Sequence, residues 1–137
     1  MDAAALVVSP FVTLLAWSVV LLVFHVSLQG FSSTLELGSA WNAGPRDEER
    51  KPAGKLAGRS SRASANFRET YPAFIGLVLA LAITGDPTGW GLTGAWTWFA
   101  CRIVYIPLYL AGVAYIRSLI WLGSLAGLLI MVATLVF

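Results

Sequence analysis

The polar stretch from Gly58 to Pro72 holds the residues best suited to chemistry. It contains three arginines, an asparagine and a glutamate, and an apolar run follows at once. On a helix, Arg62, Asn66 and Glu69 share one face, because residues four and three positions apart lie above one another. Charged and amide groups at the entry to an apolar helix are unusual, since burying charge is costly. Either this face is solvated at a membrane boundary, or it forms a binding site.

The composition places this stretch in a membrane protein with one domain. Of the 137 residues, 58% are hydrophobic and only 12% are charged, whereas a soluble domain carries about 25% charged residues. One cysteine and one histidine give no basis for a disulfide framework or a metal site. The few basic residues form no nucleic-acid-binding module. The sequence therefore predicts an all-α, integral membrane four-helix bundle.

Four apolar segments are predicted to be membrane-spanning helices, over residues of about 6–36, 61–84, 88–115 and 118–136. Each offers the roughly 20 residues that a ~30 Å hydrocarbon core requires. The connection around Asp86 has no basic residue, whereas the loop of about 38–59 has several. The positive-inside rule then places this loop and Arg117 in the cytosol and both termini outside. The basic residues of the loop are Arg46, Arg50, Lys51, Lys55 and Arg59.

The first predicted helix carries a stripe of polar residues. Their spacing of seven, four, three and four places them on one face, which should contact protein rather than lipid. Within this stripe we expect the single histidine to be packed and hydrogen bonded. The stripe consists of Ser18, His25, Gln29, Ser32 and Glu36.

The second and third predicted helices form an antiparallel hairpin around residues 85–87, so residues equally far from the turn lie at equal depth. Three polar pairs obey this symmetry: Glu69 with Arg102, Asn66 with Tyr105, and Arg62 with Tyr109. Glu69 and Arg102 are about 24 Å from the turn, near the inner boundary of the hydrocarbon core. We expect these two to form a structural ion pair, because either charge alone would cost several kcal/mol there.

These motifs, in this order, resemble the MAPEG family, the membrane-associated proteins of eicosanoid and glutathione metabolism. The resemblance covers nearly the whole chain, and the segment 42–47 is similar to that of bacterial members. It implies a homotrimer of four-helix subunits in a bacterial inner membrane. Glutathione would bind between subunits near the cytosolic face, and a lipophilic substrate would arrive from the lipid bilayer. The motifs are Asn66-Phe-Arg-Glu69-Thr-Tyr-Pro72, Arg102-x-x-Tyr105-x-x-x-Tyr109 and Arg117-Ser118.

The resemblance also implies roles for single residues. Arg117 and its neighbour Ser118 would be catalytic, with the arginine activating the glutathione thiol. Only the thiolate is a good nucleophile, and a nearby guanidinium favours that anion. A membrane-side anchor for Arg117 and a helix N-cap for Ser118 are the alternatives. The residues implied to bind glutathione, the co-substrate, are Arg62, Asn66, Glu69, Tyr105 and Tyr109.

The expected function is a membrane glutathione transferase or glutathione-dependent peroxidase that acts on lipophilic substrates. The alternative is a non-catalytic member that binds lipid, or an accessory subunit that serves as a scaffold. Three positions depart from the animal prostaglandin synthases, where basic residues or a histidine stand instead of Glu36, Ala65 and Tyr105. These departures remove positive charge near the expected anion, so the sequence does not name the substrate.

Overall fold

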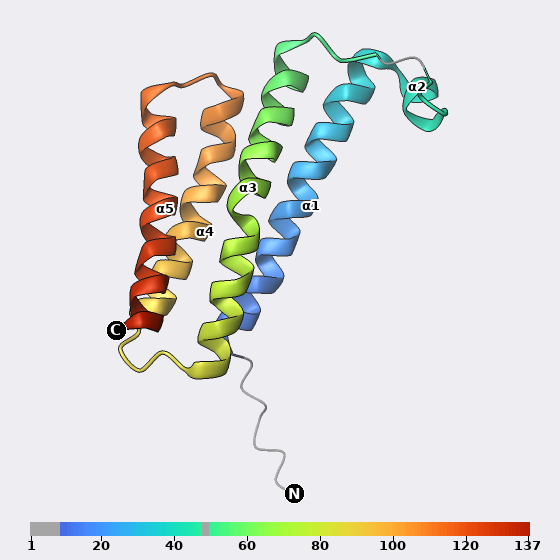
Figure 1. Cartoon of the computed structure of the whole chain (residues 1–137). Helices are drawn as coiled ribbons and strands as arrows, with labels where there is room; N and C mark the ends of the chain where they lie inside the picture. The colour runs from blue at the N-terminus through green and yellow to red at the C-terminus, as the bar shows by residue number, and fades with distance from the viewer. Residues whose placement is uncertain (1–8, 48–49) are drawn as a thin grey trace, which may run out of the picture.

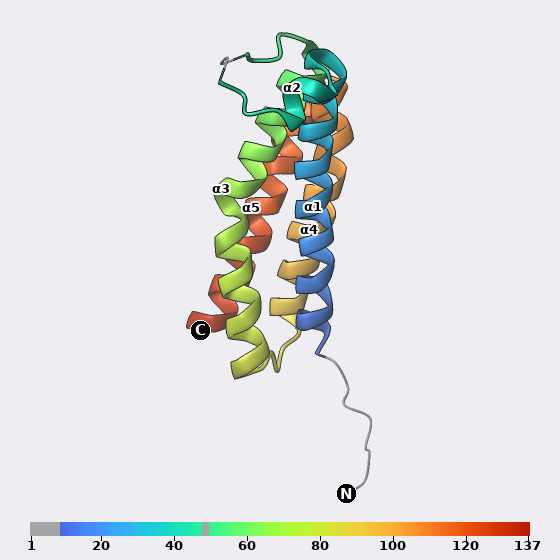
Figure 2. The same ribbon diagram turned by 90° about the vertical axis from the view of Figure 1, so that its right-hand side faces the viewer.

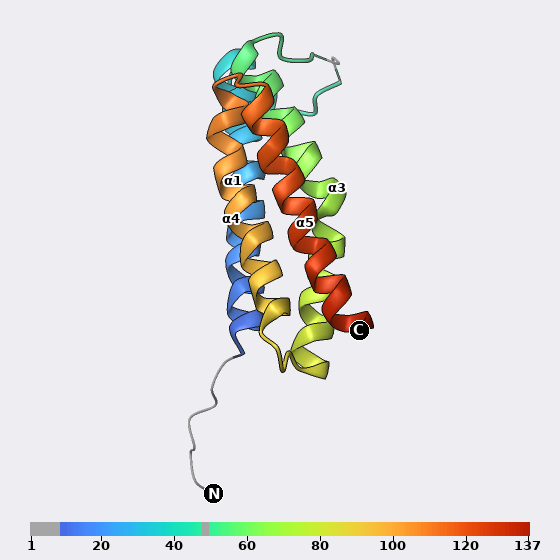
Figure 3. The same cartoon turned by 90° about the vertical axis from the view of Figure 1, so that its left-hand side faces the viewer.

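A computed structural model describes residues 9–47 and 50–137, and these form a bundle of four long helices and one short one (Figure 1). Helices α1 and α3 pack as one antiparallel pair, and α4 and α5 as another (Figures 2 and 3). The predicted all-α fold with four main helices is confirmed. The helices are α1 (Pro10–Leu37), α2 (Ser39–Ala43), α3 (Lys55–Thr84), α4 (Trp90–Leu110) and α5 (Tyr115–Val136).

Helix α1 begins at a conventional cap and buries its polar stripe. Ser9 Oγ accepts a hydrogen bond from the Phe11 amide at 3.3 Å, and Pro10 occupies the first helical position. The predicted start at residue 6 lies outside the described residues. Ser18, His25 and Ser32 are all buried, so the expectation that the stripe contacts protein is confirmed for these three residues, whereas Gln29 is half-buried and Glu36 is exposed.

The interface between α1 and α3 combines one polar contact with aromatic packing. The hydroxyls of Ser18 and Tyr71 are 2.9 Å apart, and the His25 ring stacks on Phe67 with centroids 4.7 Å apart. Neither nitrogen of His25 has a hydrogen-bond partner. The expectation of a packed histidine is confirmed, but that of a hydrogen-bonded one is wrong, because the ring is held by stacking in an aromatic environment.

Aromatic side chains from α3 and α4 fill the centre of the bundle. Trp98 stacks on Phe74 at a centroid distance of 3.9 Å and packs against Phe67 at 5.6 Å. All three side chains are fully buried. Aromatic pairs in such geometry add stabilisation beyond their buried area, so they fix α4 against α3 at the level below the polar residues.

Helix α3 starts at Lys55, earlier than the predicted start at residue 61. The reason is Glu36 at the end of α1, whose carboxylate accepts hydrogen bonds from the amides of Ala53 at 2.6 Å and Gly54 at 2.9 and 3.0 Å. A carboxylate at a helix N-terminus satisfies free amides and complements the helix dipole. The loop predicted to reach residue 59 is therefore shorter, and Arg59 belongs to a helix.

Helix α4 is shorter than predicted at both ends. Asp86 caps its start by accepting from the amides of Gly91 at 3.0 Å and Leu92 at 2.9 Å, so the helix begins at Trp90 rather than 88. It ends at Leu110 rather than 115, because Gly112 adopts a positive φ of 76° and reverses the chain.

Helix α5 begins at Tyr115 and not at Ser118 as predicted. Ser118 lies inside the first turn, where its hydroxyl donates to the Ala114 carbonyl at 3.3 Å. It is not the N-cap of this helix. Further along, α5 approaches α4 very closely, since a Cβ added at Gly94 would lie 2.6 Å from the Gly127 carbonyl oxygen.

Among the described residues, α1, α3 and α5 are long and apolar enough to cross a membrane. Helix α4 has 21 residues and packs mainly against α5, with further contacts to α3 and α1, but it carries Arg102 and two tyrosines. Its length matches that of a membrane span, and its polar residues face the bundle at the end described next.

Candidate functional site at the basic end of the bundle

The predicted site residues gather at one end of the bundle, which we call the basic end. It carries the described parts of the α1–α3 connection, residues 38–47 and 50–54, and the α4–α5 connection, residues 111–114, at the top of Figure 1. Side chains from α3, α4 and α5 meet there. Because α4 is antiparallel to both other helices, the start of α3, the end of α4 and the start of α5 come together.

Tyr109 is the residue on which this site converges. Arg62 Nε donates to the Tyr109 hydroxyl at 3.2 Å, which confirms the outermost predicted pair. The Arg117 guanidinium lies over the Tyr109 ring, 4.7 Å from its centroid. Tyr105 packs beside it with ring centroids 5.4 Å apart. Residues from three helices are therefore in contact through one tyrosine.

Arg102 is fully buried at the level below and does not pair as predicted. Its Nη1 donates to Asn66 Oδ1 at 2.8 Å, and its guanidinium lies 4.5 Å from the Tyr105 ring centroid. Its Nε and Nη2 have no hydrogen-bond partner. The expected ion pair with Glu69 is thus wrong in this structure. Glu69 is at a similar depth, but its side chain is exposed and makes no hydrogen bond to the guanidinium.

The contact with Arg102 also fixes the direction of the Asn66 amide. A guanidinium can only donate hydrogen bonds, so Asn66 must turn its carbonyl oxygen inward. Its NH₂ group then faces outward, where the side chain is half-buried. The amide is therefore presented as a donor, which suits a ligand carrying carboxylate or carbonyl oxygens.

The remaining predicted residues are exposed in the single chain. Arg62 and Glu69 lie on the outer face of α3, and Ser118 is exposed beside Arg117. Within the described part of the chain, Glu69 makes no hydrogen bond or ion pair. The site thus has one wall, made by α3, α4 and α5, and an open side along α3.

The open face of α3 continues away from the basic end as a row of small residues. Ala65, Ala73 and Gly76 are exposed, and a Cβ added at Gly76 would meet nothing within 4 Å. Small residues on a spanning helix permit close approach of another helix. This face of α3 therefore combines exposed charges with a row of small residues.

Two residues that shape the site were not predicted to do so. Arg59 Nη1 donates to the Leu110 carbonyl at 2.9 Å and holds the end of α4, and Glu36 caps α3. Arg59 lies three positions before Arg62, so an earlier helix start would have placed both on one side of α3. No three His, Cys, Asp or Glu side chains gather as a metal site would require, within residues 9–47 and 50–137.

Fold and site together define a helical membrane bundle with a cationic, tyrosine-lined site at one end. The model of the MAPEG family matches residues 14–137, and the chain belongs to this family. Its fold is a four-helix membrane bundle, and its members are membrane glutathione transferases or eicosanoid enzymes. No curated protein and no solved structure matches the chain.

Proposed function

We propose that the protein is a membrane glutathione transferase or glutathione-dependent peroxidase that acts on lipophilic substrates. The observation that carries this proposal is the convergence of Arg62 and Arg117 on Tyr109. Within the described residues neither guanidinium has a carboxylate partner. Two neighbouring positive charges are best compensated by an anionic ligand, and glutathione carries two carboxylates and an ionisable thiol.

The proposed binding mode divides the ligand among the three helices. Arg62 and the outward NH₂ of Asn66 bind carboxylate oxygens, and Glu69 binds the amine. Tyr105 and Tyr109 contact the apolar parts of the tripeptide. Arg117 stabilises the thiolate, and the exposed Ser118 hydroxyl would turn from the Ala114 carbonyl to donate a hydrogen bond to the sulfur. A downward pKa shift of about 1–2 units at that thiol would raise the thiolate fraction at neutral pH by roughly 10-fold.

The open side of the site supports the proposal of a homotrimer. Members of the family are membrane trimers that bind lipophilic substrates. In this chain the exposed face of α3 carries both Glu69 and the small residues up to Gly76. A neighbouring subunit against this face would close the site and remove the charges from lipid. We further propose that the basic end lies in the cytosol of a bacterial inner membrane.

The proposal is tested with the full chain purified in lipid nanodiscs. Calorimetry with glutathione and turnover of a generic electrophile are measured for the wild type, Arg117→Ala and Arg46→Ala. Arg46 is an exposed arginine that bonds to the backbone of Asn42, outside the site, so its variant is the matched control. We expect Arg117→Ala to lose turnover and the control to keep it. Absence of both binding and turnover in the wild type would refute the enzymatic function and favour a lipid-binding or scaffold role.

A further inference from the structure

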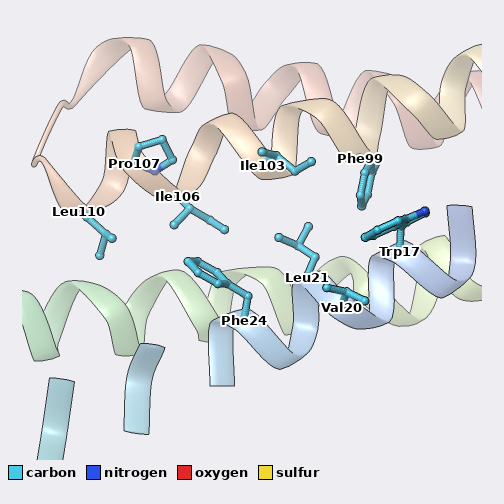
Figure 4. Close-up of a pocket in the computed structure, with 9 residues that line it drawn as sticks. All are labelled: Trp17, Val20, Leu21, Phe24, Phe99, Ile103, Ile106, Pro107 and Leu110. Atoms are coloured by element: carbon cyan, nitrogen blue, oxygen red, sulfur yellow. The ribbon is translucent and has the colours of Figure 1, made fainter. Parts of the chain in front are cut away.

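An apolar groove runs along the bundle between α1 and α4, away from the polar site. Its volume is about 550 Å³, within the range of ~300–1,000 Å³ that small-molecule sites occupy. Figure 4 shows its side chains turned toward one another across the gap between the two helices. The groove is lined by Trp17, Val20, Leu21, Phe24, Phe99, Ile103, Ile106, Pro107 and Leu110, all of them apolar.

The groove is separate from the proposed glutathione site. Leu110 lines the groove, whereas its neighbour Tyr109 contacts Arg62 and Arg117. Successive residues on a helix point about 100° apart, so the two sites use different faces of α4. A molecule in the groove would therefore lie beside α1 and would not reach the open face of α3.

The dimensions of the groove match one leaflet of a bilayer. The α4 wall extends from Phe99 to Leu110, a length of about 16 Å. The hydrocarbon thickness of one leaflet is ~15 Å, half of the ~30 Å core. Because Leu110 is the last residue of α4, the groove begins at the basic end and stops near the middle of the membrane.

A positive charge stands at the basic end of this groove. Arg59 Nη1 donates to the Leu110 carbonyl at 2.9 Å, so its guanidinium lies at the end of α4, beside the backbone of the last groove residue. Within the described residues this is its only hydrogen bond, and its other nitrogens keep free donors. A guanidinium with free donors recognises phosphate well, and basic residues at a membrane boundary attract anionic lipids.

We propose that the groove binds one phospholipid with an anionic headgroup. One acyl chain would occupy the space between α1 and α4, and the phosphate would bind Arg59. This lipid would hold α1 against α4 over the half of the bundle nearest the basic end. The proposal does not depend on glutathione binding, since it concerns another face of α4.

The test uses phosphatidylglycerol with a photoactivatable acyl chain, added to the delipidated full chain in nanodiscs. Adducts are located by proteolysis and mass spectrometry. Val20→Trp fills the groove, and Val19→Trp is its matched control, because Val19 is the neighbouring residue, 46% exposed, and does not line the groove. We expect adducts near Phe24 and Ile103 to fall about tenfold in Val20→Trp and to persist in Val19→Trp.

The headgroup is tested with the same probe on phosphatidylcholine and with excess inorganic phosphate. We expect phosphatidylglycerol to label the groove about tenfold more than phosphatidylcholine, and Arg59→Gln to abolish that preference. Inorganic phosphate should not compete, because the acyl chain of the lipid should contribute most of the binding free energy. Equal labelling of Val20→Trp and the wild type would overturn the proposal. Equal labelling by the two lipids would also overturn it. Groove peptides without any adduct would overturn it as well, and would indicate that a second copy of the protein covers the groove.

Discussion

The orientation of the Asn66 amide leads to a prediction in which stability and ligand affinity change in opposite directions. Arg102 Nη1 lies 2.8 Å from Asn66 Oδ1, so the substitution Asn66→Asp would keep the inner oxygen and give the buried guanidinium a counter-ion. A charge-assisted hydrogen bond is roughly twice as strong as a neutral one, and we expect a gain of about 1 kcal/mol in the free energy of unfolding.

The same substitution replaces the outward NH₂ donor of Asn66 by a second carboxylate oxygen. A lost hydrogen bond to a charged ligand group costs about 1.5–3 kcal/mol, so glutathione should bind about 10- to 100-fold more weakly. Glutathione affinity is measured by calorimetry, and stability by the midpoint of thermal unfolding of the same preparation. Asn66→Ala is the control, because it removes both the inner oxygen and the outward NH₂ group and should lower stability and affinity together.

Two results would refute this reasoning. If Asn66→Asp lowers the unfolding midpoint, the oxygen of Asn66 is not the partner of Arg102 in the membrane-embedded protein. If the variant binds glutathione as tightly as the wild type, the outward amide does not contact the ligand. Either result is distinguishable from misfolding, since the circular dichroism spectrum of the helices should stay unchanged.

Further predictions concern the other contacts of the site and the bundle. Tyr109→Phe should weaken glutathione binding about fivefold in calorimetry, because the hydrogen bond from Arg62 is lost. Tyr109→Leu should weaken binding further, because the ring under Arg117 is also lost. Glu36→Gln should lower the free energy of unfolding by about 1 kcal/mol, since the cap of α3 loses its charge; an unchanged denaturation midpoint would contradict this. Gly127→Ala should lower the midpoint of thermal unfolding, because the added methyl group would collide with the α4 backbone. Gly76→Leu should leave the subunit folded, but native mass spectrometry should show a shift from trimer to monomer.

The helices and their buried faces could be predicted because they depend on local spacing. The stripe containing Ser18, His25 and Ser32 is buried as its periodicity indicated. The ends of the helices could not be predicted in the same way. They are set by side chains that reach across from other segments, such as Glu36 onto the start of α3 and Arg59 onto the end of α4.

The sequence predicted which site residues lie at the same depth in the membrane, and depth decides only some of the contacts between them. Equal distance from the turn correctly brought Arg62 to Tyr109. It did not bring Glu69 to Arg102, because equal depth does not decide which way a long side chain reaches. Arg102 donates to Asn66, which lies three positions before Glu69 on the same side of α3, and the Glu69 side chain stays exposed. The guanidinium is held in this direction by the rings of Phe67 and Tyr105, and hairpin symmetry gives no information about that packing.

The ultraviolet absorbance of the glutathione thiolate tests the central claim most directly. Free glutathione is only a few per cent thiolate at neutral pH. If Arg117 at the ring of Tyr109 stabilises the bound thiolate, adding glutathione to the purified protein should produce a saturable thiolate band that Arg117→Ala abolishes and Arg46→Ala retains. A wild-type protein that binds glutathione without this band, or a band that survives in Arg117→Ala, would contradict the account.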